Sequence, residues 1–264
     1  SRSRSLDLLY DERLCTQGCQ RCTQHSSCFK RKDNTSAVTI LRHGLTENEM
    51  RLVAHACPSG AISLCGDEMN SEQIMAQVRR DIAFYQRSGG GLTLSGGEPF
   101  MQPKLAQQVL QIAHQEGIHT AVESCLHVPW HQIEQSLPSL DLVLADLKHV
   151  DKERFFHWTR GKVELPIANL KRLAEHGVPM QIRVPLIPGF NADRASIEAI
   201  TDTAASLGTV QEIHFLPYHT LGMGKYALLD LPYQAPDTPL DDPDLLRFAH
   251  AYAQRQGLTP VTRG

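Results

Sequence analysis

The chain has 264 residues, enough for one sizeable α/β domain with a small appendage, and its apolar fraction of 41% is ordinary for a globular protein. Its formal net charge of −3 gives no general attraction to nucleic acid or to anionic membranes, so neither is expected as a partner. No apolar run reaches the roughly 20 residues of a membrane helix, and no apolar stretch follows the basic start as in a secretory signal, so we expect a cytoplasmic protein.

Seven cysteines are distributed very unevenly, because six of them fall within the first 65 residues. They are Cys15, Cys19, Cys22, Cys28, Cys57 and Cys65, with Cys125 alone farther along. An odd number of clustered cysteines in a cytoplasmic protein argues against a disulfide framework and for metal ligation. The chain also begins with Ser1 rather than Met, so we expect the natural protein to start earlier.

The first 66 residues are irregular, polar and rich in cysteine. Residues 6–14 are charged and broken, and we expect no strand there. A short helix is expected from Thr46, whose spacing to Glu49 fits a capping box. The pattern changes after residue 66, so we predict a Cys-rich insert over 1–66 and an α/β domain over 67–264.

From residue 67 onward, the apolar periodicities of strands and helices alternate. Strands are expected at 92–94, 119–125, 140–147, 180–186 and 213–217. Helices are expected over 71–88, 103–116, 129–137, 165–176, 197–207 and 245–252, with a long loop between 217 and 239. Such alternation predicts a parallel sheet with helices outside, closed or partly closed as a barrel, whose chemistry lies at the carboxyl ends of the strands.

Polar residues follow several of these strands, at the rim where such a sheet places its site. They are Ser95-Gly96-Gly97-Glu98, Glu123-Ser124, Asp146 with Lys148, Arg183, and Tyr218-His219. Glycines allow close approach of the backbone, and Glu98 could accept hydrogen bonds from an ammonium group. The set therefore suits a zwitterionic ligand that carries a nucleoside. The alternative is that each is a solvated loop residue.

The N-terminal cysteines suggest an iron–sulfur site. Cys15-x3-Cys19-x2-Cys22 places three thiolates within eight residues, and Cys57-Pro58 can supply a fourth, which resembles the ferredoxin manner of holding a [4Fe–4S] cluster. The alternative is zinc, which also binds four thiolates. Two more cysteines could replace a ligand or stay free, Cys28 and Cys65, whereas Cys125 fits a packed residue at the rim.

Residues 88–99 read Ser-Gly-Gly-Gly-Leu-Thr-Leu-Ser-Gly-Gly-Glu-Pro and are followed in order by four further segments, 117–120, 146–148, 182–189 and 216–219. This ordered set resembles the glycyl-radical-enzyme activating enzymes of the radical S-adenosylmethionine superfamily, which include the pyruvate formate-lyase activating enzymes. The resemblance covers residues 67–264, and residues 11–66 are similar to the auxiliary-cluster insert of a subset of the family. It implies a partial (β/α)6 barrel with a small ferredoxin-like insert.

The resemblance also implies a chemistry. In the family three cysteines hold a [4Fe–4S] cluster whose fourth iron chelates S-adenosylmethionine. An electron cleaves the sulfonium C–S bond, and the 5′-deoxyadenosyl radical takes a hydrogen atom from a glycine of the partner. The implied partners are a glycyl-radical enzyme and an electron donor such as flavodoxin or ferredoxin. By this resemblance, the methionyl amino group would be bound by Gly96, Gly97 and Glu98. The rest of the cofactor site would be lined by Asp146, Lys148, Arg183 and His219.

The Cys15, Cys19 and Cys22 triad has the spacing of the radical-generating motif but not its context. In the family an aromatic residue normally precedes the third cysteine, where this chain has Arg21, and the motif follows a buried first strand. We therefore expect the triad to hold an auxiliary cluster, and the first strand and radical motif to lie before Ser1. Such a chain would not run the radical step, and its sheet would expose an unpaired strand edge.

Two functions of other classes stay open from the sequence. One is a non-catalytic electron-transfer or scaffold module that keeps only the auxiliary cluster, and the other is a zinc-stabilised binding protein. The ordered barrel segments favour the activating enzyme, since an electron-transfer module needs no glycine turn and no polar strand ends. We assign no catalytic residue.

Overall fold

The computed structural model describes residues 6–31 and 37–262. The chain divides into two compact units, each with its own core. The larger unit contains Met69–His219 and the chain from Pro236 onward, and the smaller contains the chain up to Glu68 together with Thr220–Ala235. Segment 220–235, expected to belong to the barrel, is grouped in the structure with the Cys-rich part.

The larger unit is built on a sheet of six strands, ordered β10-β9-β8-β7-β6-β5, in which every neighbouring pair is parallel. The strands are β5 (Gly91–Leu94), β6 (His119–Ser124), β7 (Leu142–Asp146), β8 (Met180–Leu186), β9 (Val210–Pro217) and β10 (Thr259–Val261). Consecutive parallel strands require crossover connections, and helices supply them. The expected α/β fold with a partial barrel is therefore confirmed. Among the described residues β5 pairs with β6 alone and forms one edge of the sheet.

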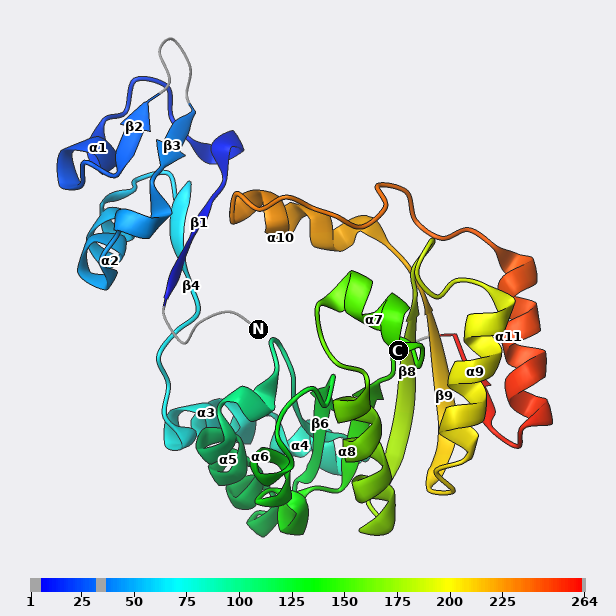
Figure 1. Ribbon diagram of the computed structural model, residues 1–264. Helices are drawn as coiled ribbons and strands as arrows, with labels where there is room; N and C mark the ends of the chain where they lie inside the picture. Colours follow the sequence, from blue (N-terminus) through cyan, green and yellow to red (C-terminus); the bar gives the residue numbers. More distant parts are fainter. Residues whose placement is uncertain (1–5, 32–36, 263–264) are drawn as a thin grey trace. The chain divides into compact units, whose positions relative to one another are not determined.

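Helices cover one face of this sheet and bury it (Figure 1). They are α3 (Ser71–Val78), α4 (Ile82–Ser88), α5 (Pro103–Gln115), α6 (Trp130–Glu134), α8 (Glu164–Glu175), α9 (Arg194–Ala205) and α11 (Pro243–Arg255). Helix α7 (Lys152–Thr159) instead packs on the segments that follow β6 and β8, through Phe155 against His127 and Trp158 against Phe190. Alternate strand residues such as Val143, Ile182 and Ile213 are fully buried in the main core. Leu173 of α8 and Ile200 of α9 belong to the same core. The opposite face of the sheet carries the remaining, more polar residues.

Three elements of the larger unit differ from expectation. The helix predicted over 71–88 is interrupted by a 3-10 turn at Arg79–Asp81, where Arg79 forms an ion pair with Glu116 beyond the end of α5. The sequence analysis also did not predict α7 and β10. Both are short, and β10 contains a proline in a strand of three residues, which weakens its periodic pattern.

The smaller unit contains two antiparallel pairs, β1 (Asp7–Tyr10) with β4 (Ile62–Cys65), and β2 (Phe29–Arg31) with β3 (Val38–Ile40). Its helices are α1 (Arg21–His25), α2 (Glu47–Ala56) and α10 (Met223–Leu228). The capping box of Thr46 and Glu49 is present as predicted. The expectation that residues 6–14 contain no strand was wrong. Leu8 points into the apolar core of this unit, which gives β1 its stability despite the charges around it.

Segment 220–235 is anchored within the smaller unit by Arg42. The guanidinium donates to the carbonyl oxygen of Leu8 at 2.6 Å, to Asp7 at 3.1 Å and to the carbonyl oxygen of Leu228 at 3.1 Å. One cation thus joins β1 to the end of α10, two parts of the chain that are far apart in sequence. None of the helices within the described ranges has the length and apolarity to cross a membrane.

Candidate functional site

The strand register brings four charged or titratable side chains to one face of the sheet. Asp146 of β7 is the register partner of Arg183 of β8, which in turn is the partner of His214 of β9. Glu123 of β6 is the partner of Leu144, two residues before Asp146, and therefore shares its face. The opposite face is apolar and lies under the helices. The site face is consequently polar and lies near the carboxyl ends of the strands, where we expected it.

Ion pairs connect these strand ends. Arg183 contacts Glu123 at 2.8 Å, and the other carboxylate oxygen of Glu123 accepts a hydrogen bond from the hydroxyl of Ser95 at 3.0 Å. Lys148 contacts Asp146 at 3.4 Å. Burial raises the pKa of Asp146, and the nearby Lys148 partly offsets the effect. The two carboxylates and two cations nearly cancel in charge, which suits a ligand that carries both signs.

A buried polar atom is left over in this group. Nε of Arg183 is shielded from solvent and has no hydrogen-bond partner among the described residues. An unpaired buried donor is costly, so such an atom calls for an acceptor from an ordered water molecule or from a bound group. A polar ligand on the site face would supply the missing acceptor.

Glu98 differs from the expectation that its carboxylate would grip an ammonium group. One of its oxygens accepts from the hydroxyl of Ser124 at 2.8 Å and from the N–H of Phe100 at 3.2 Å. The other accepts from the N–H and the thiol of Cys125, at 3.0 and 3.1 Å. A carboxylate has about four acceptor positions, so these internal bonds occupy it. In this structure Glu98 fastens the glycine turn to the end of β6. Cys125 is a packed rim residue, as expected.

The glycine turn itself leaves open space beside its two glycines. Gly96 has φ +110°, a conformation that only glycine adopts readily. A Cβ placed on Gly96 or Gly97 would meet no atom within 4 Å, so the surrounding space is free. The backbone of this turn can therefore be approached closely by a bound molecule.

The two histidines near the end of β9 have different positions. His219, the histidine chosen from the sequence, is exposed and lies two residues beyond the end of β9. His214 was not chosen, yet it lies on the site face beside Arg183, and its Nε2 is 3.1 Å from Glu212. The alternation of buried Ile213 and Phe215 along β9 was the pattern that could have identified it.

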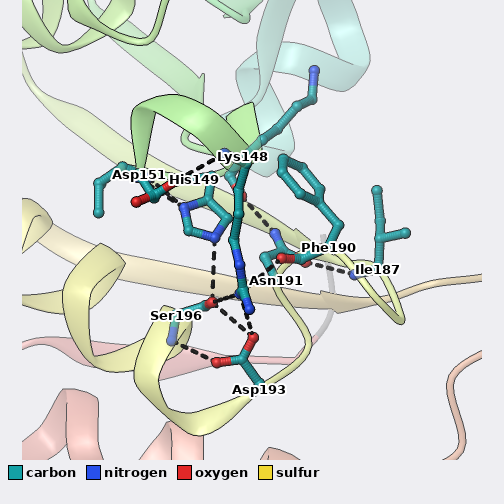
Figure 2. A network of polar contacts seen from close by, with 10 residues as sticks. Lys148, His149, Asp151, Ile187, Phe190, Asn191, Asp193 and Ser196 are labelled. Atoms are coloured by element: carbon teal, nitrogen blue, oxygen red, sulfur yellow. Dashed lines mark hydrogen bonds and ion pairs between the residues drawn. The ribbon is translucent and has the colours of Figure 1, made fainter. Parts of the chain in front are cut away.

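A buried polar network makes hydrogen bonds with the loop that contains Lys148, and Figure 2 shows its members. His149 accepts the N–H groups of Val150 and Asp151 on Nδ1, both at 2.9 Å, and its Nε2 lies 3.2 Å from the hydroxyl of Ser196. Because Nδ1 accepts, the ring proton belongs on Nε2. Burial, and then the positive charge of Arg154, lower the pKa of His149 and keep the ring neutral.

Four of the seven cysteines line one small cavity in the smaller unit: Cys15, Cys19, Cys22 and Cys57. They are the four ligands chosen from the sequence. Cys28 and Cys65 are not part of this lining, and Cys65 is exposed. Over residues 6–31 and 37–262, no three histidine, cysteine or acidic side chains are grouped closely enough to hold a single metal ion.

The surroundings of Cys57 favour its thiolate, whereas burial raises the pKa of Cys22. The N–H of Ile62 points at the sulfur of Cys57 at 3.4 Å. Burial alone would raise the pKa of Cys57, but this bond and a contact with Ser59 outweigh it and lower the pKa. Arg31 also lines the cavity and donates to the carbonyl oxygen of Cys19 at 2.6 Å. Hydrogen bonds to sulfur are among the means by which proteins tune iron–sulfur clusters.

Comparison with known proteins identifies the family. The chain matches the Radical SAM superfamily over residues 13–200. It is 34% identical over 261 residues to the isethionate sulfite-lyase activating enzyme of Nitratidesulfovibrio vulgaris, an alignment that covers 96% of this chain and 83% of that protein. The chain belongs to the glycyl-radical-enzyme activating enzymes of the radical SAM superfamily.

Two further comparisons agree with this activating-enzyme family. The pyruvate formate-lyase 2-activating enzyme of Escherichia coli is 32% identical, with 80% of this chain and 72% of that protein aligned. A crystal structure of a domain of a pyruvate formate-lyase activating enzyme from Bacteroides vulgatus superposes with a TM-score of 0.55 at 30% identity, covering 66% of this chain and 99% of that domain. Enzymes of the radical SAM family use a [4Fe–4S] cluster and S-adenosylmethionine.

Proposed function

We propose that this activating enzyme binds S-adenosylmethionine on the polar face of the six-stranded sheet and acts on a partner glycyl-radical enzyme. The observation that carries the proposal is the meeting of Glu123, Asp146, Lys148 and Arg183 at the carboxyl ends of three adjacent strands, beside an open glycine turn. These groups offer both charges to a zwitterion, and the turn offers backbone atoms at close range.

Different residues of the site would contact different parts of the S-adenosylmethionine molecule. The open turn at Gly96 and Gly97 would meet the methionyl part, while Glu98 holds the turn in place. Asp146, Lys148 and Arg183 would line the rest of the site, with Nε of Arg183 gaining an acceptor from the ligand. When bound together, S-adenosylmethionine and a radical-generating [4Fe–4S] cluster, distinct from the cluster proposed below, would supply a carbon-centred radical that removes a hydrogen atom from a glycine of the partner. His219 stays part of the proposal as an exposed residue at the rim.

We propose further that Cys15, Cys19, Cys22 and Cys57 hold an auxiliary [4Fe–4S] cluster rather than the radical-generating one. The family match begins at residue 13 and so spans the triad, whose spacing fits either role. Two observations support the auxiliary role. The triad lies in the smaller unit, among antiparallel strands, and a fourth cysteine lines the same cavity, whereas a radical-generating cluster leaves one iron for S-adenosylmethionine.

The test combines iron content, spectrum and ligand binding on the full chain. After anaerobic reconstitution we expect about four irons per chain, with the broad visible absorption of a [4Fe–4S] cluster. Cys22→Ala should lose most of this absorption. The matched control is Cys65→Ala, which changes an exposed cysteine outside the cavity and should keep it. A colourless, zinc-containing protein would contradict the cluster.

Binding and cleavage of S-adenosylmethionine separate the two parts of the proposal. The site on the sheet predicts binding of S-adenosylmethionine, which Arg183→Met should weaken, and calorimetric titration measures it. Absence of binding by the unaltered chain would overturn the site. The auxiliary assignment predicts that the reduced chain forms no 5′-deoxyadenosine by itself. Robust formation of 5′-deoxyadenosine would assign the triad to the radical motif instead. Iron without S-adenosylmethionine binding is the result that the electron-transfer alternative expects.

A further inference from the structure

A single buried amide joins the ends of two strands at the candidate site. Asn191 lies in the turn after β8 and is 0% exposed. Its Nδ2 donates to the carbonyl oxygen of Lys148 at 2.6 Å and to that of Pro185 at 2.9 Å. Its Oδ1 accepts the N–H of Ile187 at 2.7 Å. The amide is thus bonded to the loop after β7 on one side and to the end of β8 on the other.

The position of this amide matters because the sheet no longer holds the two segments together there. The register pairs of β7 and β8 end at Asp146 and Arg183, and one further backbone bond joins Leu147 to the carbonyl oxygen of Arg183 at 3.0 Å. Lys148 lies just beyond, where Asn191 contacts its carbonyl oxygen. Figure 2 shows Asn191 between the backbone of Lys148 and the turn of Ile187.

The neighbouring network fixes the same loop from the other side. Arg154 donates to the carboxylate of Asp193 at 2.8 Å and to the hydroxyl of Ser196 at 3.0 Å, and Ser196 lies within 3.2 Å of His149. The loop that follows β7 is therefore bonded at two separate points, to the turn after β8 through Asn191 and to the first turn of α9 through Ser196. Asn191 is the member of this network that bonds to Lys148 itself.

We propose that Asn191 is a positioning residue that holds Lys148, and with it the Asp146–Lys148 pair, beside Arg183. Its role for ligand binding rests on the proposed function of this face. Buried amides that satisfy all their hydrogen bonds fix the geometry of a site more tightly than apolar packing does, because each bond has a preferred direction. Removing the amide takes the side-chain partner from two part-buried carbonyl oxygens and one N–H, and the loop of Lys148 becomes free to shift.

The experiment compares Asn191→Ala with Thr120→Val in the full chain. Thr120 is also fully buried, and its hydroxyl donates to the carbonyl oxygen of Ser139 at 2.7 Å, but it lies at the amino end of β6, at the opposite end of the sheet from the site. Both variants lose buried hydrogen bonds, so both should lower the unfolding temperature. Only Asn191→Ala should speed amide hydrogen exchange over residues 147–151, and only it should weaken calorimetric binding of S-adenosylmethionine, by about tenfold or more.

The possible outcomes distinguish a failure of the positioning role from a failure of the proposed function. Unchanged exchange over residues 147–151 in Asn191→Ala, or an equal increase in Thr120→Val, would overturn the positioning role. Faster exchange with unaltered affinity would show that the loop moves without serving the ligand and would also overturn it. If the unaltered chain does not bind S-adenosylmethionine, the proposed function fails, while the exchange measurement still decides whether Asn191 positions Lys148. Asn191→Ser provides the milder variant if the alanine variant does not fold.

Discussion

Replacing Ser124 by alanine should destabilise the larger unit strongly although it removes a single oxygen atom. Ser124 is 3% exposed. Its hydroxyl donates to the Glu98 carboxylate at 2.8 Å and accepts the N–H of Leu126 at 2.9 Å. A hydrogen bond to a charged group contributes about 1.5–3 kcal/mol, and an unpaired buried N–H costs about 1–3 kcal/mol. We therefore expect Ser124→Ala to lower the free energy of unfolding by at least about 2.5 kcal/mol, the sum of the two lower values.

Tryptophan fluorescence during urea unfolding measures this loss. The chain has two tryptophans, Trp130 and Trp158, and both lie in the larger unit, so their emission follows the unit that contains Ser124. The matched control is Ser206→Ala, which removes a hydroxyl that is exposed and bonded to the carbonyl oxygen of Thr203. The control should change stability by no more than about 0.5 kcal/mol. If Ser124→Ala costs no more than the control, the assigned role of Glu98 as the anchor of the glycine turn is wrong.

Three further outcomes are expected. Folding lowers the pKa of His149 below its ordinary 6.5. The neutral ring therefore contributes its full stabilisation above pH 6.5, and this contribution declines as the pH falls from 6.5 toward the lowered pKa. Midpoints of urea unfolding should show this decline with pH, and His149→Gln should flatten it. Arg42→Met should cost about 1 kcal/mol for each of its three hydrogen bonds and hasten limited proteolysis near Leu228. Gly96→Ala should cost about 1–2 kcal/mol because φ is +110°. Gly97→Ala should spare stability, because its methyl group would meet no atom within 4 Å, and it should weaken S-adenosylmethionine binding in calorimetry by filling part of the open space at the turn.

The fold was predictable because the larger unit repeats one pattern with clear boundaries. Buried apolar strands alternate with amphipathic helices, and glycines such as Gly117 and Gly177 end helices with positive φ. The short elements were not predictable in this way. Strand β1 has four residues, of which Leu8 alone is buried, so its periodicity is lost among charged neighbours.

The site was predictable as a place but less so in its internal bonding. Parallel strands bring their carboxyl ends together, which is why Asp146 and Arg183 could be assigned to one rim from the sequence. The hydrogen-bond partners of Glu98 could not be predicted from the sequence. A glutamate at the end of a strand can face either a ligand or its own chain, and the local sequence is the same in both cases. His214 was missed because a histidine within a strand resembles a packing residue until the register is known.

The grouping of residues 220–235 with the Cys-rich part has a practical consequence for protein engineering. The polypeptide passes between the two units three times. Removing the N-terminal residues alone would delete Arg42 and with it the hydrogen bond to the carbonyl oxygen of Leu228 that anchors this segment. A cleaner excision would also remove 220–235 and join the flanking residues with a short linker. Tyr218 already brings those ends together, since its hydroxyl donates to the carbonyl oxygen of Pro236 at 2.7 Å and its own carbonyl oxygen accepts the N–H of Leu240 at 2.9 Å.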